Sequence, residues 1–203
     1  MESFERAFYH DGYQLGLKAV SSADPNFSSA LSEMYEAIDN LNDSLFDFSK
    51  KQGKNIACQK GCQWCCHQPV FALDYELDYL NDYITQNLTK IQQDEISEKA
   101  KQKRFQFDSL SGDDLLNAKH PCPLLENGAC MAYSARPMAC RIYLSTNLNS
   151  CLKFYHEPED KNSYPALLDF PMRAGRLMNE GFKAALKTKG LIAKEFRIEE
   201  KLL

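Results

Sequence analysis

Four cysteines lie within nine consecutive residues, and this stretch constrains the chain more than any other feature of its sequence. They form a C-x3-C-x2-C-C pattern at Cys58, Cys62, Cys65 and Cys66. Four more follow at wider intervals: Cys122, Cys130, Cys140 and Cys151. Eight cysteines in 203 residues are about 4% of the chain, below the density of small disulfide-stapled proteins. A fold for this chain must therefore place eight thiols where they have a chemical use.

The rest of the sequence favours a reduced state for these thiols. The N-terminal stretch MESFERAFYHDGYQLG carries acidic residues early and lacks an apolar core region, so we expect no secretory signal. No run of 18 apolar residues occurs, so we expect no transmembrane helix and no membrane partner. We therefore expect a cytoplasmic protein, in which disulfides are rare. Metal binding or redox chemistry is then favoured over disulfides and over inert buried cysteines.

The charge of the chain is unevenly distributed. The net charge of −4 argues against nucleic acid as a partner. However, residues 50–66 carry Lys50, Lys51, Lys54 and Lys60 without any acid, and residues 119–153 are also basic. Positive charge near a thiol favours the thiolate, the form that binds metal. The alternative is that these lysines are ordinary solvated surface residues.

Hydrophobic periodicity predicts a mainly α-helical single domain over residues 1–203. Apolar residues recur at steps of three and four over 26–51, which predicts a long helix there. Asp74 and Thr89 are expected to cap two further helices, and the C-terminal helix is predicted over 171–189.

The two ends of the chain are harder to interpret. The first twenty residues give no clear prediction, because Gly12 and Gly16 weaken a helical pattern. The C-terminal tail is expected either to dock through Phe196 and Ile198 or to stay loose.

Residues 58–76 and 122–151 are predicted to form irregular metal-binding loops. In the second loop, Asn127-Gly128 predicts the tight turn of one short β-hairpin. The expected fold is thus a helical domain with irregular cysteine-bearing loops and one short β-hairpin, built around a metal centre.

The adjacent pair Cys65-Cys66 bears on the kind of centre. In an extended chain, neighbouring side chains point to opposite faces. Two adjacent thiolates therefore reach two metals, or different corners of a larger cluster, more easily than one small tetrahedral ion. We expect the later cysteines to fold over the first group, so that all or most of the eight surround one cluster or two metal centres. Thiolates select zinc, copper(I) or iron–sulfur clusters.

The C-x3-C-x2-C part also matches the three-cysteine cradle of radical S-adenosylmethionine enzymes. Those enzymes place this motif beside the strands of a partial α/β barrel. This chain lacks alternating strand and helix units, so we rank that interpretation as a minor alternative.

Two segments, CQKGCQWCC and CPLLENGACMAYSARPMACRIY, resemble the YkgJ-like or CxxCxxCC family of cysteine-cluster proteins. The shared elements include Glu76 and the motif C-x2-Y-x2-R-P-x2-C-R, which runs from Cys130 to Arg141. The first gap holds three residues where the family's short name has two. The resemblance implies a zinc- or iron-chelating protein, a type sometimes labelled as an iron–sulfur oxidoreductase. A flagellin lysine methylase with a cysteine cluster is distantly similar, which leaves methyl transfer open.

Several side chains near the cysteines are candidates for supporting roles. Arg136 and Arg141 flank Cys140 and are predicted to hydrogen-bond thiolate or sulfide and to offset negative charge. Their alternative role is an ion pair with a helix carboxylate such as Glu76, itself a candidate base or helix-dipole partner.

Histidines and aromatic residues also lie beside the cysteines. His67, His120 and, less favourably, His156 are candidate ligands, although eight thiols leave no need for a histidine. Trp64 and Tyr133 are more typical of core or lid residues that keep water from sulfur.

We expect an iron–sulfur cluster with a redox or substrate-modifying role. The adjacent cysteine pair, the excess of thiols and the basic surroundings favour it over zinc. The alternative is a zinc-binding structural, partner-binding or metal-handling module without catalysis. No nucleophile–base pair or glycine-rich phosphate loop identifies a reaction, so the sequence leaves open whether the chain is an enzyme.

Overall fold

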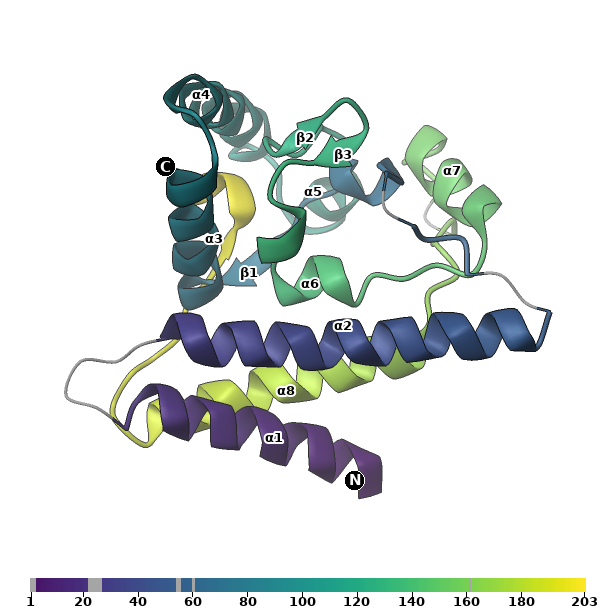
Figure 1. The fold of residues 1–203 in the computed structure, drawn as a ribbon. Coiled ribbons are helices and arrows are strands. Elements are labelled where there is room, and N and C mark those ends of the chain that lie inside the picture. Colours follow the sequence, from purple (N-terminus) through teal and green to yellow (C-terminus); the bar gives the residue numbers. More distant parts are fainter. Residues whose placement is uncertain (1–2, 22–26, 54–55, 60, 161) are drawn as a thin grey trace.

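The protein is described by a computed structural model that covers residues 3–21, 27–53, 56–59, 61–160 and 162–203 (Figure 1). It is mainly α-helical, as the periodicity predicts. The helices are α1 Ser3–Ala19, α2 Phe27–Lys51, α3 Asp74–Asn87, α4 Lys90–Phe107, α5 Gly112–Asn117, α6 Met138–Arg141, α7 Leu148–His156 and α8 Asp169–Lys187. The strands are β1 Phe71–Leu73, β2 Leu125–Glu126, β3 Ala129–Cys130 and β4 Glu195–Arg197.

Helices α1, α2 and α8 form a layer at the base of the molecule, and the cysteine-bearing segments lie above it (Figure 1). We call these three helices the base. The α1 and α8 backbones approach so closely that a Cβ atom on Gly12 would overlap the Met178 carbonyl, and one on Gly181 would overlap the Tyr9 carbonyl. The glycine of α1 that weakens the helical signal in the sequence is therefore needed for packing, and residues 3–19 are a helix despite it.

The apolar core has two parts that differ in composition. One lies between the base and the upper half, and includes Leu31, Met34 and Ile38 of α2. The other lies among α3, α4 and the β2–β3 hairpin, and Cys122 is one of its buried members. The thiols are therefore next to, and partly inside, a hydrophobic core.

The long helix predicted over 26–51 is confirmed as α2, with residue 26 outside the described residues. Thr89 caps α4 as expected, because its hydroxyl accepts a hydrogen bond from the Gln92 amide at 3.3 Å. Asp74 is instead the first residue of α3, and Leu73 stands at the cap position. The Leu73 amide donates to the Glu76 carboxylate at 3.1 Å, so Glu76 satisfies the helix start.

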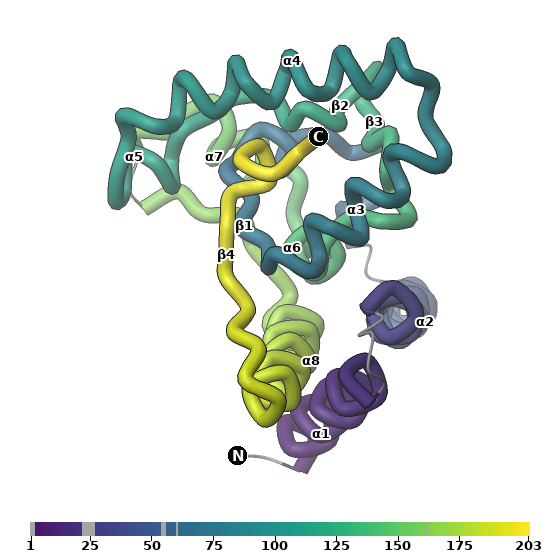
Figure 2. The backbone as a smooth tube through the Cα atoms, turned by 90° about the vertical axis from the view of Figure 1, so that its left-hand side faces the viewer, coloured from purple at the N-terminus to yellow at the C-terminus, as the bar shows by residue number. Residues whose placement is uncertain are grey.

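The structure confirms the predicted C-terminal helix and, of the two alternatives for the tail, the docked one. Helix α8 begins two residues before the expected start at residue 171, and Gly190 follows its end with φ of +74°. The tail docks through strand β4, which pairs antiparallel with β1, and Ile198 is buried. Figure 2 shows β4 running from the end of α8 into the upper half.

The loops predicted over 58–76 and 122–151 contain more regular structure than expected. A 3-10 turn spans Trp64–His67, and α6 and α7 fall within or overlap the second range. Cys151 therefore lies on a helix and not on an irregular loop. The Asn127-Gly128 turn between β2 and β3 is confirmed, with both residues at positive φ. Within the described ranges, no helix is both long enough and apolar enough to cross a membrane.

Candidate metal centre

Seven cysteines line one cavity of about 1140 Å³ between the upper segments and the base. They come from both cysteine-bearing parts of the chain: Cys58, Cys62, Cys65, Cys66, Cys122, Cys130 and Cys140. Cys151 lies outside this lining. The later cysteines thus fold over the first group, although their side chains divide into two sets.

The first set, which we call the inner quartet, consists of Cys66, Cys122, Cys130 and Cys140. The Cys122 amide donates to the Cys66 carbonyl at 2.7 Å, which joins the two cysteine-bearing segments directly. Cys130 ends β3, opposite Leu125, and packs with Cys66 and Cys122 against the apolar cluster below α4. Cys140 lies on α6, and its amide donates to the Pro137 carbonyl at 2.9 Å.

Electrostatic coupling connects all members of the inner quartet. Burial raises the pKa of Cys122 to about 11 and that of Cys130 to about 12, and it raises the pKa of Cys140 well above its ordinary value. Neighbouring thiols add to each shift: Cys66 acts on the other three, and these three act on one another. Every pair within the quartet therefore lies within electrostatic reach.

Lys103 of α4 supplies positive charge beside the inner quartet. Its side chain is fully buried, and its Nζ atom donates to the Gln68 and His120 carbonyls, both at 3.1 Å. It thereby joins the segment after Cys66 to the segment before Cys122. Burial lowers the pKa of Lys103, and the thiols of Cys122, Cys140 and Cys66 oppose that shift because they favour the ammonium.

The second set, which we call the outer quartet, consists of Cys58, Cys62, Cys65 and Cys151. The Ser145 amide donates to the Cys58 sulfur at 3.0 Å. Burial raises the pKa of Cys58, and the thiols of Cys62 and Cys151 raise it further. Burial raises the pKa of Tyr143, and the thiols of Cys65, Cys151 and Cys58 raise it further, so all three lie within electrostatic reach of one phenol.

The two quartets meet at the adjacent pair. A hydrogen bond between the side chains of Cys65 and Cys66, followed by burial, raises the pKa of Cys66. All eight cysteines are free. Among the residues that the structure describes, no three or more histidine, cysteine or carboxylate side chains are already arranged to hold a metal ion. The metal centre expected from the sequence is therefore not preformed, and binding would have to draw the thiols of each quartet closer together.

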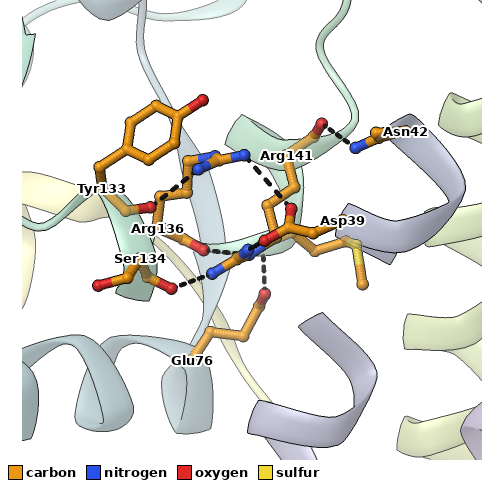
Figure 3. A network of polar contacts seen from close by, with 8 residues as sticks. Asp39, Asn42, Glu76, Tyr133, Ser134, Arg136 and Arg141 are labelled. Carbon is orange, nitrogen blue, oxygen red and sulfur yellow. Dashed lines mark hydrogen bonds and ion pairs between the residues drawn. The ribbon is translucent and has the colours of Figure 1, made fainter. Parts of the chain in front are cut away.

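The two arginines that flank Cys140 bind a carboxylate, but not the one considered from the sequence. Arg136 and Arg141 both pair with Asp39 of α2, and Arg136 does so at 3.3 Å (Figure 3). Arg141 also donates to the carbonyls of Ser134 and Arg136. These bonds fix the loop that carries Cys140 to the base. Arg136 is nevertheless close enough to the thiol of Cys140 to lower its pKa.

Glu76 is a second anchor between the upper half and the base. Its buried carboxylate accepts hydrogen bonds from the Tyr35 hydroxyl at 3.0 Å and from the Met138 amide at 2.7 Å, in addition to the Leu73 amide. Burial raises its pKa, and these hydrogen bonds oppose the shift. Because its oxygens are occupied in this way, Glu76 acts as a structural acceptor here.

His67, His156 and Trp64 lie in one aromatic contact with Tyr155, whereas the His120 ring packs on Phe107. His67 is hydrogen-bonded at Nδ1 to the Gln63 carbonyl, and its ring packs on Tyr155 of α7. Trp64 packs on Tyr155 and His156. Tyr133 stacks on the Arg136 guanidinium, 3.8 Å from its ring centre. The ring contacts of Trp64 and His67 with Tyr155 and His156 hold the Trp64–His67 turn against α7.

Two residues of the site were missed by the sequence analysis. Lys103 follows Ile96 and Ala100 and precedes Phe107 at helical spacing, so a lysine at a core position was a usable signal. Asp39 gave no such signal, because its partners lie about a hundred positions away in the chain.

Of the basic residues near the first cysteines, Lys50 and Lys51 are exposed at the end of α2, and Lys54 and Lys60 lie outside the described residues.

Comparison with known families agrees with the resemblance seen in the sequence. A family model named CxxCxxCC, with the description "Putative zinc- or iron-chelating domain", matches residues 57–163, more than half of the 203-residue chain. The chain belongs to the CxxCxxCC family. The matched range contains both quartets, Lys103 and the two arginines. No curated protein and no solved structure gives a match. Membership makes the chain a cysteine-containing module of a zinc- or iron-chelating type.

Proposed function

We propose that this CxxCxxCC protein binds an iron–sulfur cluster through the inner quartet and uses it in a redox or substrate-modifying reaction. The observation that carries the proposal is the mutual approach of four free thiols, from segments more than fifty residues apart, beside a buried lysine. Soft thiolates are the donors that iron–sulfur clusters use. The donor set therefore fits such a cluster.

The charges around the quartet also suit an anionic centre. Four thiolates with either a cluster or a zinc ion carry net negative charge, and burial of that charge requires compensation. Lys103 and Arg136 provide cations within electrostatic reach of the quartet. The sulfurs also lie next to a hydrophobic core, and exclusion of water is one of the factors that tune a cluster's reduction potential.

The size of the cavity and a few polar side chains in its lining favour a role beyond structural support. Structural zinc sites are normally closed, whereas these thiols lie against a cavity that continues to the base. Its far wall includes Arg176, Asn179 and Lys183, which occupy one face of α8. These polar groups could orient a substrate or a partner side chain, and the cluster when bound would supply electron transfer or an open iron.

Zinc binding without catalysis is the second candidate. The family description names zinc as well as iron. The upper segments have short secondary structure, and metal often contributes folding free energy in such regions. In this case the metal would hold the loops together for contact with a partner.

Anaerobic purification followed by analysis of iron, sulfide and zinc tests the proposal. We expect a brown protein with broad absorption near ~400 nm, as thiolate-bound iron–sulfur clusters give. Stoichiometric zinc in a colourless protein would favour the second candidate. Oxygen must be excluded throughout, because a cluster that loses iron leaves thiolates free to bind zinc.

Serine variants of the proposed ligands test the role of the thiols. Cys66→Ser and Cys130→Ser are each expected to lower the metal content, because each removes a sulfur donor of the inner quartet. Ala139→Ser is the matched control, since it adds a hydroxyl beside Cys140 without removing a thiol. Full metal content in both cysteine variants would contradict their assignment as ligands.

A further inference from the structure

We propose that the outer quartet, Cys58, Cys62, Cys65 and Cys151, is a second metal site, separate from that of the inner quartet and suited to one thiophilic divalent cation of the zinc class. The inference rests on the proposed function, because it requires that the thiols bind metal. The Cys65–Cys66 peptide bond then lies at the boundary between the two sites.

Backbone pairing brings the first members of the outer quartet to one side of the cavity. The Ala57 amide donates to the Ser145 carbonyl at 3.0 Å, and the Ser145 amide donates to the Cys58 sulfur. The Cys62 amide donates to the Gln59 carbonyl at 3.0 Å, so the chain turns back after Cys58. Cys58 and Cys62 are thereby placed beside the segment that leads into α7.

Helix α7 brings Cys151 to the same place. Asn147 caps this helix by accepting hydrogen bonds from the amides of Asn149 and Ser150. Tyr155 of α7 packs on Trp64 and His67, with ring centres 5.1 and 4.8 Å apart. The Trp64–His67 turn that contains Cys65 is thus held against the helix that carries Cys151.

The inner quartet is held by contacts that differ from those of the outer quartet, although Cys66 belongs to the same Trp64–His67 turn as Cys65. Cys66 is joined to Cys122 by its carbonyl, and Lys103 ties the segments on both sides of that pair. No partner in these bonds belongs to α7 or to the Ser145 segment. Adjacent residues of one turn are therefore tied to two sets of thiols. The divergence expected for an extended chain is not observed, because Cys65 and Cys66 lie on a 3-10 turn and their side chains are hydrogen-bonded to each other.

Donor number and hydrogen bonding indicate what the outer quartet binds. Four cysteines satisfy a tetrahedral zinc-class ion, and one such ion or one cluster uses only four thiolates of the eight. An amide that donates to sulfur, as Ser145 does to Cys58, is the kind of contact that orients a thiolate ligand. Lys103, the fully buried cation of the inner quartet, makes its hydrogen bonds away from the outer one. A single divalent cation, whose tetrahedral coordination four cysteines complete, is therefore the centre that we assign to the outer quartet.

Metal analysis of variants separates the two sites. The full chain, purified anaerobically, is compared with Cys151→Ser, Cys140→Ser and the double variant, and Asn149→Ser on the exposed face of α7 is the matched control. We expect Cys151→Ser to lose one divalent ion and keep the inner metal, Cys140→Ser to do the reverse, and the control to keep both. Circular dichroism checks that each variant is folded.

Reconstitution with cadmium-113 gives a readout that does not depend on activity. Two tetrathiolate resonances are expected from the unmodified chain, with a different one lost from each single variant. A single resonance from the unmodified chain, or loss of both from a folded Cys151→Ser variant, would overturn the second site. Metal binding by the unmodified chain would still stand in either case. Absence of any bound metal would overturn the proposed function as well, so the two failures are distinguishable.

Discussion

The base and the cysteine-bearing upper half of this protein are stabilised in different ways. In the base, two long helices approach until the backbone of each fills the space where a side chain of the other would be, as at Gly12 and Gly181. In the upper half, the short cysteine-bearing elements surround a large cavity and depend on buried polar anchors such as Glu76 of α3 and Lys103 of α4. From this comparison we expect the base to fold without metal, and we propose that the final packing of the upper half depends on what the thiols bind.

The largest expected effect comes from a substitution within the base. Gly181→Val places a side chain against the Tyr9 backbone, so we expect α1 and α8 to separate and the free energy of unfolding to fall by more than ~3 kcal/mol. Denaturant unfolding in the presence of a chelator measures this loss without any contribution from metal. Lys187→Val, at an exposed position of the same helix, should cost less than ~1 kcal/mol. Equal, small losses for the two variants would show that the close approach is not needed.

A substitution at the junction of the two regions should have the next largest effect. Glu76→Gln replaces an acceptor oxygen by an amide donor that faces donors from Tyr35, Leu73 or Met138. We expect a loss of ~2–3 kcal/mol in the free energy of unfolding, since a buried donor is left without its acceptor. Asp78→Asn, an exposed change on the same helix, is the control and should shift it by less than ~0.5 kcal/mol. A Glu76→Gln variant as stable as the control would remove Glu76 as an anchor.

Removal of the buried cation should affect metal binding and leave the base unchanged. Lys103→Met keeps much of the side-chain volume but loses the charge and both hydrogen bonds. We expect metal affinity of the inner quartet to fall ~10–100-fold, as is usual when groups that support metal ligands are lost. Competition with a chromophoric chelator measures it, and Lys101→Met, an exposed change on the same helix, is the control. Unchanged affinity would mean that Lys103 only fills space.

The smallest effect concerns Lys119, which lies over the Phe154 ring at 3.8 Å and joins the segment before Cys122 to α7. Burial lowers its pKa from 10.5 to about 8, so folding disfavours its charged form. The resulting destabilisation is complete below pH 8 and disappears as the pH rises to 10.5. The stability of the unmodified chain should therefore improve relative to Lys119→Met over that range.

Paired denaturation curves of the two metal-free proteins, at steps from pH 7 to 10.5, measure this difference. Titration of the cysteines is common to both proteins and cancels in the comparison. A difference that stays constant with pH would contradict the lowered pKa of Lys119. Lys119→Arg, which keeps its charge throughout, serves as the control and should show no such pH dependence against Lys119→Met.

The sequence predicted most of the helices and where the later cysteines fold, but not how the upper half is held. The 26–51 helix was predictable because its apolar period is long and uninterrupted. Helix α1 was missed, since the sequence cannot distinguish a glycine that weakens a helix from one that a neighbouring helix requires. Helix α7 was missed although Asn147 carries a capping signal. The pairing of Arg136 and Arg141 with Asp39 depends on tertiary contacts between distant segments, which local pattern does not encode.

The account depends most on sulfur ligation by cysteines from both parts of the chain. X-ray absorption at the metal edge of the anaerobically purified protein tests this most directly. The account predicts that the atoms bonded to the metal are sulfur, at about 2.3 Å for zinc or iron. The number of these sulfur atoms should fall in Cys66→Ser and in Cys140→Ser alike. A first shell dominated by nitrogen or oxygen, or one unchanged by both substitutions, would contradict it.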